Sequence, residues 1–330
     1  MNPSSSTTLL TQVVPWSVHD SPRTILIGDS VESDGRFLLH TVASQVLENN
    51  TRQGRVLWLS CGPLTVKLIA TALKKIGCEA ATNYLRTLES NQQQQSSLVS
   101  SLPLSIRSLT ADMGKQLETD EDLNMEAFTK QVYREAKEWL QQQQASSSST
   151  STSTDSVAVP WIILDDVSAL GALVGERLAY GLVVSFNALA VRTESFGLVV
   201  RYSQDLDQER SSGASTVAGA SVEQRSRQPD WVGAGGKGQR QAQQQDCVPW
   251  ERSLVEVADC LVDVTPLASG YTREAHGRLL FTAVAAGRGW GGDIKGRTAT
   301  SSSANDATPL VFNYCLTDNK VHAIPIRANV

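Results

Sequence analysis

The hydrophobic and polar positions of the chain form short, almost fully apolar runs separated by longer periodic segments. Four runs are rich in β-branched and aromatic residues: RTILIG at 23–28, RVLWLSC at 55–61, PWIIL at 160–164 and FGLVVRY at 196–202. A weaker fifth run, LSIRSL, covers 104–109. Strands that are covered on both faces have this apolar pattern, so the runs predict a buried parallel sheet.

Segments with helical periodicity lie between these runs. Residues 37–49, 64–76 and 125–140 repeat apolar positions at helical spacing, and Gly77 is a natural C-terminal stop for the second segment. Residues 170–191 are apolar nearly all round, which predicts a helix buried between a sheet and a second surface, of this chain or of a partner subunit. This alternation favours a parallel sheet with helices on both faces.

The pattern changes after residue 202. Four strand-like runs follow without helical segments between them, at 261–264, 278–285, 310–316 and 321–326. TDN at 317–319 is typical of a hairpin turn. We therefore predict an α/β fold in which antiparallel strands finish a parallel core, the architecture of RecA-like domains, with residues 1–330 forming a single domain.

Three segments lack an apolar pattern. They are the low-complexity run at 141–156, a Gly-, Ser-, Gln- and Arg-rich segment at 204–246, and a Gly-, Ser- and Thr-rich segment at 287–307. Such compositions bury too little surface to offset the entropy of ordering, so we predict disordered surface insertions.

Composition narrows the classes of function. Charged residues make up 19% of the chain and its net charge is −5, which disfavours a strongly basic nucleic-acid binder but not a local basic patch. The five cysteines, at 61, 78, 247, 260 and 315, form no CxxC pair and no cluster with histidine. Cys61, Cys78, Cys260 and Cys315 lie in or beside apolar runs, so we expect buried free thiols in a reducing compartment. With neither a signal peptide nor a membrane-length apolar run, the sequence predicts a soluble intracellular protein.

The segment TILIGDSVESDGRFLLH, at 24–40, has the outline of a phosphate-binding loop between a strand and a helix. A working loop reads GxxxxGK[ST]: backbone amides and the lysine hold phosphate, and the hydroxyl binds magnesium. Here six residues instead of four separate Gly28 from Gly35. Arg36 stands in the place of the lysine, and Phe37, which cannot bind a metal, stands in the place of the hydroxyl.

The same loop carries three carboxylates, Asp29, Glu32 and Asp34. One carboxylate 4 Å from a phosphate charge costs about 4 kcal/mol at an effective dielectric constant near 20. Arg36 offsets only part of this repulsion. We interpret the loop as a strand-to-helix turn that keeps the fold but has lost the ligand, and we assign no catalytic, cofactor-binding or metal-binding residues.

A second landmark is the apolar strand in VPWIILDDVSAL, at 159–170, which ends in Asp165 and Asp166. It resembles a Walker B strand, whose acidic residue holds the magnesium ion of a nucleotide. Because the loop offers no place for magnesium nucleotide, we favour a structural role in which the carboxylates cap the next turn or helix. A residual ATPase that uses Asp165 or Asp166 is the alternative.

A different class of function follows from ILIGDS, at 25–30, which resembles the nucleophile block of GDS-type serine esterases. Ser30 would be the nucleophile, with Asp318 and His322 as orienter and base. Their spacing is D-x-x-x-H instead of that family's D-x-x-H, across the predicted hairpin turn. Two GxGxxG matches, at 233–238 and 287–292, lack the strand-and-helix context of a dinucleotide site, so we attribute them to glycine-rich composition.

Three segments in order carry a resemblance to one known family. They are ILIGDSVESDGRFLLH at 25–40, PWIILDDVSALGALVG at 160–175 and ADCLVDVTPLASGYTREAHGRLLF at 258–281. LASGYTREAHGRL, at 267–279, is the most specific part. The chain resembles subunit six of the Elongator complex, from near residue 20 to the C-terminus and with the insertions between the matching parts.

This resemblance implies a RecA-like fold that lacks working Walker motifs and binds no cofactor. It also implies a hetero-hexameric ring built from two copies each of subunits four, five and six. The ring docks on the catalytic Elongator core, which modifies wobble uridines (U34) of tRNA. It binds tRNA, and ATP hydrolysis by the ring promotes tRNA release. The chain is then expected to be a non-catalytic accessory subunit, cytoplasmic and nuclear, although the insertions depart from shorter family members.

Overall fold

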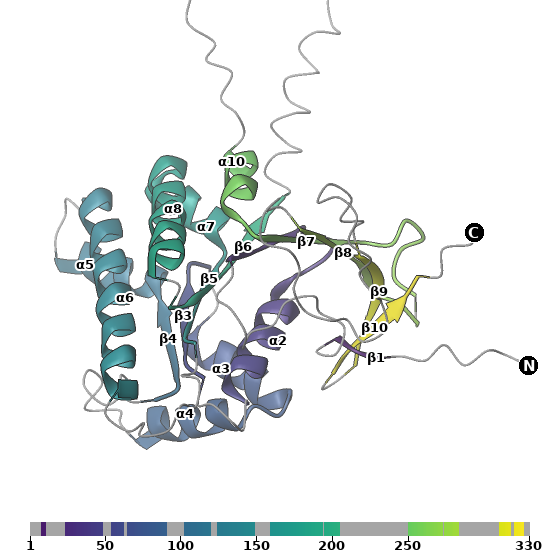
Figure 1. The fold of residues 1–330 in the computed structure, drawn as a ribbon, viewed down its shortest axis with the longest axis horizontal. Coiled ribbons are helices and arrows are strands. Elements are labelled where there is room, and N and C mark those ends of the chain that lie inside the picture. The colour runs from purple at the N-terminus through teal and green to yellow at the C-terminus, as the bar shows by residue number, and fades with distance from the viewer. Residues whose placement is uncertain are drawn as a thin grey trace, which may run out of the picture.

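The computed structural model of the chain describes residues 8–10, 24–48, 54–62, 65–90, 102–119, 124–148, 159–193, 195–204, 250–272, 274–283, 310–317 and 320–326 (Figure 1). Its strands form one sheet in the order β1-β10-β9-β8-β7-β2-β6-β5-β3-β4. The parallel part consists of β7 (Cys260–Thr265), β2 (Thr24–Asp29), β6 (Gly197–Ser203), β5 (Trp161–Asp165), β3 (Val56–Ser60) and β4 (Leu104–Ser108). The antiparallel part consists of β8 (Gly277–Ala283), β9 (Leu310–Leu316), β10 (Val321–Pro325) and β1 (Thr8–Leu9).

This topology confirms the predicted fold class, a RecA-like α/β fold whose parallel core is finished by antiparallel strands. β2, which precedes the candidate loop, pairs in parallel with both β6 and β7. β6 separates β2 from β5, the strand that ends in Asp165. The predicted hairpin also forms, because β9 pairs antiparallel with β10 and the Thr317 amide donates to the Lys320 carbonyl oxygen at 2.9 Å.

Helices cover both faces of the parallel part (Figure 1). One face carries α2 (Arg36–Leu47), α3 (Val66–Lys75) and α4 (Glu79–Ser90). The other carries α5 (Leu109–Thr119), α6 (Met125–Ser148), α7 (Val167–Val174), α8 (Glu176–Thr193) and α10 (Trp250–Val257). Successive residues of β2 therefore enter two different cores: Ile25 and Ile27 pack on the α2 side, and Leu26 packs on the other.

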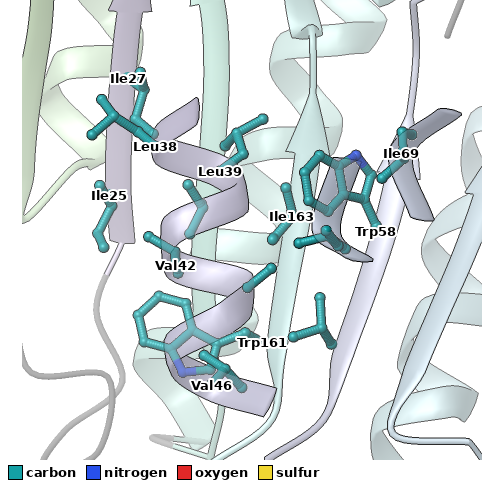
Figure 2. Packing of buried hydrophobic residues seen from close by; sticks show 14 of the residues in the cluster. Ile25, Ile27, Leu38, Leu39, Val42, Val46, Trp58, Ile69, Trp161 and Ile163 are labelled. Carbon is teal, nitrogen blue, oxygen red and sulfur yellow. The ribbon is translucent and has the colours of Figure 1, made fainter. Parts of the chain in front are cut away.

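Helix α2 fixes the orientation of the candidate loop, because its apolar face lies flat on the central strands (Figure 2). Leu38, Leu39 and Val42 are fully buried against a cluster that includes Trp58 and Trp161. Each such side chain stabilises the fold by about 1.5–3 kcal/mol relative to exposure. The first turn of α2 is therefore held in place at the carboxyl end of β2.

The segment at 170–191 differs from the prediction of one continuous helix. Gly175, with a φ of 95°, ends α7, and α8 begins at Glu176. Residues of both helices, from Leu170 to Ala190, are buried in the core of this chain, and α8 contacts α6 and α10. Helices of this chain therefore cover the inner positions of this segment, while Leu173 and Val191 remain exposed.

The prediction of a disordered insertion at 141–156 is wrong for its first half, because α6 continues to Ser148. Glutamine is a good helix former, and Gln143 is buried with its side-chain oxygen accepting from Arg55. Residues 149–156, 205–246 and 287–307 lie outside the described residues. Helices α4, α5 and α10 were not predicted.

The thiols of Cys61, Cys78 and Cys260 are free and buried, as predicted, and that of Cys315 is half-buried. Cys247 lies outside the described residues. Within the described ranges, none of the helices is both long and apolar enough to cross a bilayer.

The contact between β5 and β6 leads to a prediction at Gly197. A Cβ atom there would lie 2.3 Å from Cδ2 of Trp161, whose ring is fully buried. We expect Gly197→Ala to lower the free energy of unfolding by about 1–3 kcal/mol, because the indole has no room to retreat. Gly181→Ala is the matched control: a Cβ atom meets nothing within 4 Å, and alanine in a helix interior should stabilise by about 0.5–1 kcal/mol. Urea unfolding measures both, and equal effects of the two substitutions would contradict the close contact.

Candidate functional site

The loop between β2 and α2 forms a tight turn closed by two serines. The Ser33 amide donates to the Ser30 carbonyl oxygen at 3.0 Å, and the Ser30 amide donates back at 3.3 Å. The Ser33 hydroxyl donates to the Val264 carbonyl oxygen at 2.7 Å, which leaves the Ser30 hydroxyl to donate to Ser33 Oγ at 2.8 Å. Tyr271 donates its hydroxyl to the Glu32 carbonyl oxygen at 2.6 Å. The turn is therefore attached to β7 and to the segment that follows β7.

The amides at the start of α2 also have partners within the chain. The Gly35 amide donates to Asp29 Oδ2 at 2.8 Å, and the Arg36 amide donates to Asp34 Oδ1 at 2.9 Å. In a phosphate-binding loop, amides at this place donate to the ligand. Here oxygens of the loop's own carboxylates accept from them.

A buried ion cluster lies beside this loop, where β2, β5 and β6 end. Arg201, from β6, donates from Nη1 to Asp29 Oδ2 at 2.8 Å and from Nε to Asp165 Oδ1 at 2.7 Å. Its Nη2 lies 3.1 Å from Asp166 Oδ2. The side chains of Arg201, Asp29 and Asp165 are only 6%, 3% and 3% exposed. We call these four residues the Arg201 cluster.

Charge in the Arg201 cluster is unbalanced, because three carboxylates surround one guanidinium. Burial raises the pKa of Asp29 to about 6, although Arg201 opposes this shift. Burial also raises the pKa of Asp165, again against the influence of Arg201. For Arg201, burial by itself lowers the pKa, but the three carboxylates outweigh it and the pKa is raised. Arg201 therefore stays charged, while Asp29 holds its negative charge less readily than an exposed aspartate does.

Asp166 has the structural role that the sequence predicted for a carboxylate at the end of this strand. It is the N-cap of α7, and its Oδ1 accepts from the Ser168 amide at 3.1 Å and the Ala169 amide at 3.2 Å. Its φ of 69° places it in the left-handed region, which aspartate tolerates better than most residues. Oδ1 of Asp166 thus caps a helix while Oδ2 pairs with Arg201, so both oxygens have partners.

Arg36 and Phe37, which stand in the places of the P-loop lysine and hydroxyl, contact other side chains of this chain. Arg36 Nε lies 3.3 Å from Asp34 Oδ1, and Arg36 lines a groove of about 330 Å³ together with His40, Leu68 and Leu316. The ring of Phe37 packs against that of Tyr314, with centroids 4.7 Å apart. In the described part of the chain, no group of three or more His, Cys, Asp and Glu side chains is arranged to hold a metal ion.

The residues of the esterase alternative are not brought together. Ser30 follows β2, whereas His322 lies on β10, four positions away in the sheet. At about 4.8 Å per strand, the two strands are roughly 19 Å apart, beyond the reach of a hydrogen bond. Asp318 lies outside the described residues. The predicted nucleophile and base therefore do not form a pair.

Sequence reasoning missed Arg201 and Gln204, both at the end of β6. Gln204 donates from Nε2 to Asp263 Oδ1 at 2.9 Å, and its backbone amide donates to the Asp29 carbonyl oxygen at 2.7 Å. A Cβ atom on Gly28 would lie 2.3 Å from Gln204 Nε2, so this side chain lies directly over the start of the loop. One signal for Arg201 was present: a single charge within the apolar run FGLVVRY requires a buried partner.

Comparisons with known proteins found similarity to solved structures but not to known sequences. No protein-family model matches the chain, and no curated protein sequence matches it. Among solved structures, it is similar to the crystal structure of a KaiC-like protein from the hyperthermophilic archaeon Pyrococcus horikoshii OT3. The identity is 8%, the match covers 92% of this chain and 90% of that chain, and the TM-score is 0.43. The RecA-like class therefore rests on the strand order and the position of the loop between β2 and α2.

Proposed function

We propose that this chain is a non-catalytic accessory subunit of the Elongator complex. In this role it joins a hetero-hexameric RecA-like ring with subunits four and five. The ring binds tRNA and supports modification of the wobble uridine, U34, by the catalytic core subunits. The proposal combines the RecA-like fold with the resemblance of residues 25–40, 160–175 and 258–281 to subunit six of that complex.

One observation supports a non-catalytic role: side chains of this chain already bind the groups of the loop that would hold a nucleotide. The Gly35 amide and Arg201 both donate to Asp29, and Asp165, at the Walker B position, is bound to Arg201. A magnesium nucleotide needs free amides for its phosphates and a free carboxylate for its metal. In this arrangement the Gly35 and Arg36 amides and the Asp165 carboxylate are occupied, which favours a role for the domain in an assembly through its surface.

The two alternatives are less well supported by the geometry. A serine hydrolase needs a base within hydrogen-bond reach of Ser30, and His322 lies four strands away. A residual ATPase needs Asp165 or Asp166 as a metal ligand. Both residues pair with Arg201 instead, and Asp166 also caps α7.

Affinity purification of the full chain from its native cells tests the proposal. We expect two further RecA-like subunits in equal amount, together with larger Elongator subunits and tRNA. The native mass of the isolated ring should correspond to two copies of each of three chains. Recovery without RecA-like partners or other Elongator subunits would contradict the proposed role.

Calorimetry of the isolated chain with magnesium ATP separates this role from a residual ATPase. We expect no saturable heat for the wild type. Micromolar binding that is lost in Asp165→Asn but kept in Asp112→Asn would favour the ATPase instead, because Asp112 is bound to Arg107, outside the Arg201 cluster.

A further inference from the structure

Two hydrogen-bond donors converge on a single oxygen of Asp29. The Gly35 amide, at the start of a 12-residue helix, and Nη1 of Arg201 both lie 2.8 Å from Asp29 Oδ2. A helix N-terminus and a guanidinium are the donors with which proteins commonly bind oxyanions. We propose that the Asp29 carboxylate is a built-in substitute for a bound anion, an autoinhibitory contact that keeps external oxyanions away from these two donors.

The positions of the donors do not depend on Asp29. Gly35 is held by α2, whose residues Leu38 and Leu39 are fully buried on the sheet. Arg201 is held by β6, by its pair with Asp166 and by its bond to Asp165, whose place an asparagine oxygen can take as acceptor. Truncation of Asp29 at Cβ therefore removes the carboxylate and leaves both donors directed at the space it occupied.

The net charge of the Arg201 cluster determines which further residue must be replaced before an anion can bind in the place of the Asp29 carboxylate. The Arg201 cluster contains three carboxylates and one guanidinium, a formal charge of −2. Loss of Asp29 alone leaves Asp165 and Asp166 against Arg201, which still repels an anion. Neutralising Asp165 as well brings the cluster to zero, and the amide end of α2 then favours an anion. The contact thus closes the site in two ways, by filling the position and by supplying excess negative charge.

This closing contact is independent of the role in Elongator, because it concerns only the response of the isolated chain to a simple oxyanion. Sulfate is a suitable probe, since its charge is constant across the working pH range. The test variant is Asp29→Ala combined with Asp165→Asn. The matched control is Glu32→Gln combined with Asp34→Asn, which changes the net charge equally but alters exposed residues on the same loop.

Sulfate is titrated into the full chain at constant ionic strength set with chloride, and the readouts are the amide resonance of Gly35 and the melting temperature. We expect saturable binding to the test variant, about tenfold or more tighter than to the wild type or the control. Adding Arg201→Gln to the test variant should abolish it. Equal sulfate affinity of the wild type and the test variant would overturn the proposal, as would a folded test variant that binds no sulfate. If the alanine variant does not fold, Asp29→Gly with Asp165→Asn serves instead, because glycine also leaves the Gly35 amide and Arg201 without the carboxylate.

Discussion

Replacing Arg201 with methionine is expected to lower the free energy of unfolding at pH 7.5 by about 3–5 kcal/mol, the range observed when one partner of a buried ion pair is removed. The guanidinium pairs with the carboxylates at the ends of β2 and β5 and with that of Asp166, the N-cap residue of α7. Without it, Asp29 and Asp165 remain almost fully buried with no positive charge beside them. A loss of this size is a large part of the 5–15 kcal/mol or so that stabilises a typical domain.

Arg107→Met is the matched control, because Arg107 also pairs with more than one carboxylate, those of Asp112 and Glu135. Its side chain is 25% exposed, so solvent screens the pairs and we expect a loss of about 1 kcal/mol or less. Urea unfolding of both variants gives the comparison. Equal losses would show that burial does not set the strength of the Arg201 cluster. Asp29→Asn and Asp165→Asn added to Arg201→Met should restore part of the lost stability, since they remove the unpaired charges.

The sequence predicts most of this fold because its central strands are buried on both faces and are therefore continuously apolar. β9 begins and ends at the predicted residues, and the other predicted strands are displaced by only a few residues. The break between α7 and α8 was missed, since Gly175 lies within an apolar segment and only its positive φ ends the helix. The extension of α6 was missed because a glutamine run has a low-complexity composition and also a high helix propensity.

The candidate site shows what a linear pattern does not contain. From the sequence we identified the acidic loop and its departures from the P-loop pattern at Arg36 and Phe37. We attributed the loss of the ligand to repulsion by carboxylates facing the site. In the structure, Asp29 instead faces inward and is bound by Arg201, 172 residues further along the chain. That pairing depends on β6 lying next to β2 in the sheet. Neighbours in a sheet follow from the crossovers between strands, and the residues of a single strand do not specify them.

The pH dependence of stability should separate two buried groups whose effects have opposite signs. Burial raises the pKa of Asp29 from 3.8 to about 6, so the folded state binds this proton more tightly than the unfolded state. The contribution of Asp29 to stability therefore increases as the pH falls from about 6 to about 4. Burial lowers the pKa of His40 from 6.5 to about 4, so the unfolded state binds that proton more tightly. Its contribution is lost over nearly the same range, so the effects of Asp29 and His40 oppose each other in the wild type.

A single substitution at Asp29 or at His40 removes the pH effect of that residue and leaves the effect of the other. In Asp29→Asn, the stability relative to the wild type should decline as the pH falls from 7 to 4, because the variant lacks the stabilisation that protonation of Asp29 gives the wild type. In His40→Gln, it should rise over the same interval. Each difference amounts to about 3 kcal/mol, since one pKa unit corresponds to about 1.4 kcal/mol. Urea unfolding of the three proteins at pH 4, 5, 6 and 7 measures these slopes, with Asp34→Asn as the control for a change of charge at an exposed carboxylate on the same loop. Parallel pH profiles for the wild type and Asp29→Asn would mean that Asp29 titrates in its ordinary range, which is incompatible with a buried carboxylate that shares one guanidinium with two others.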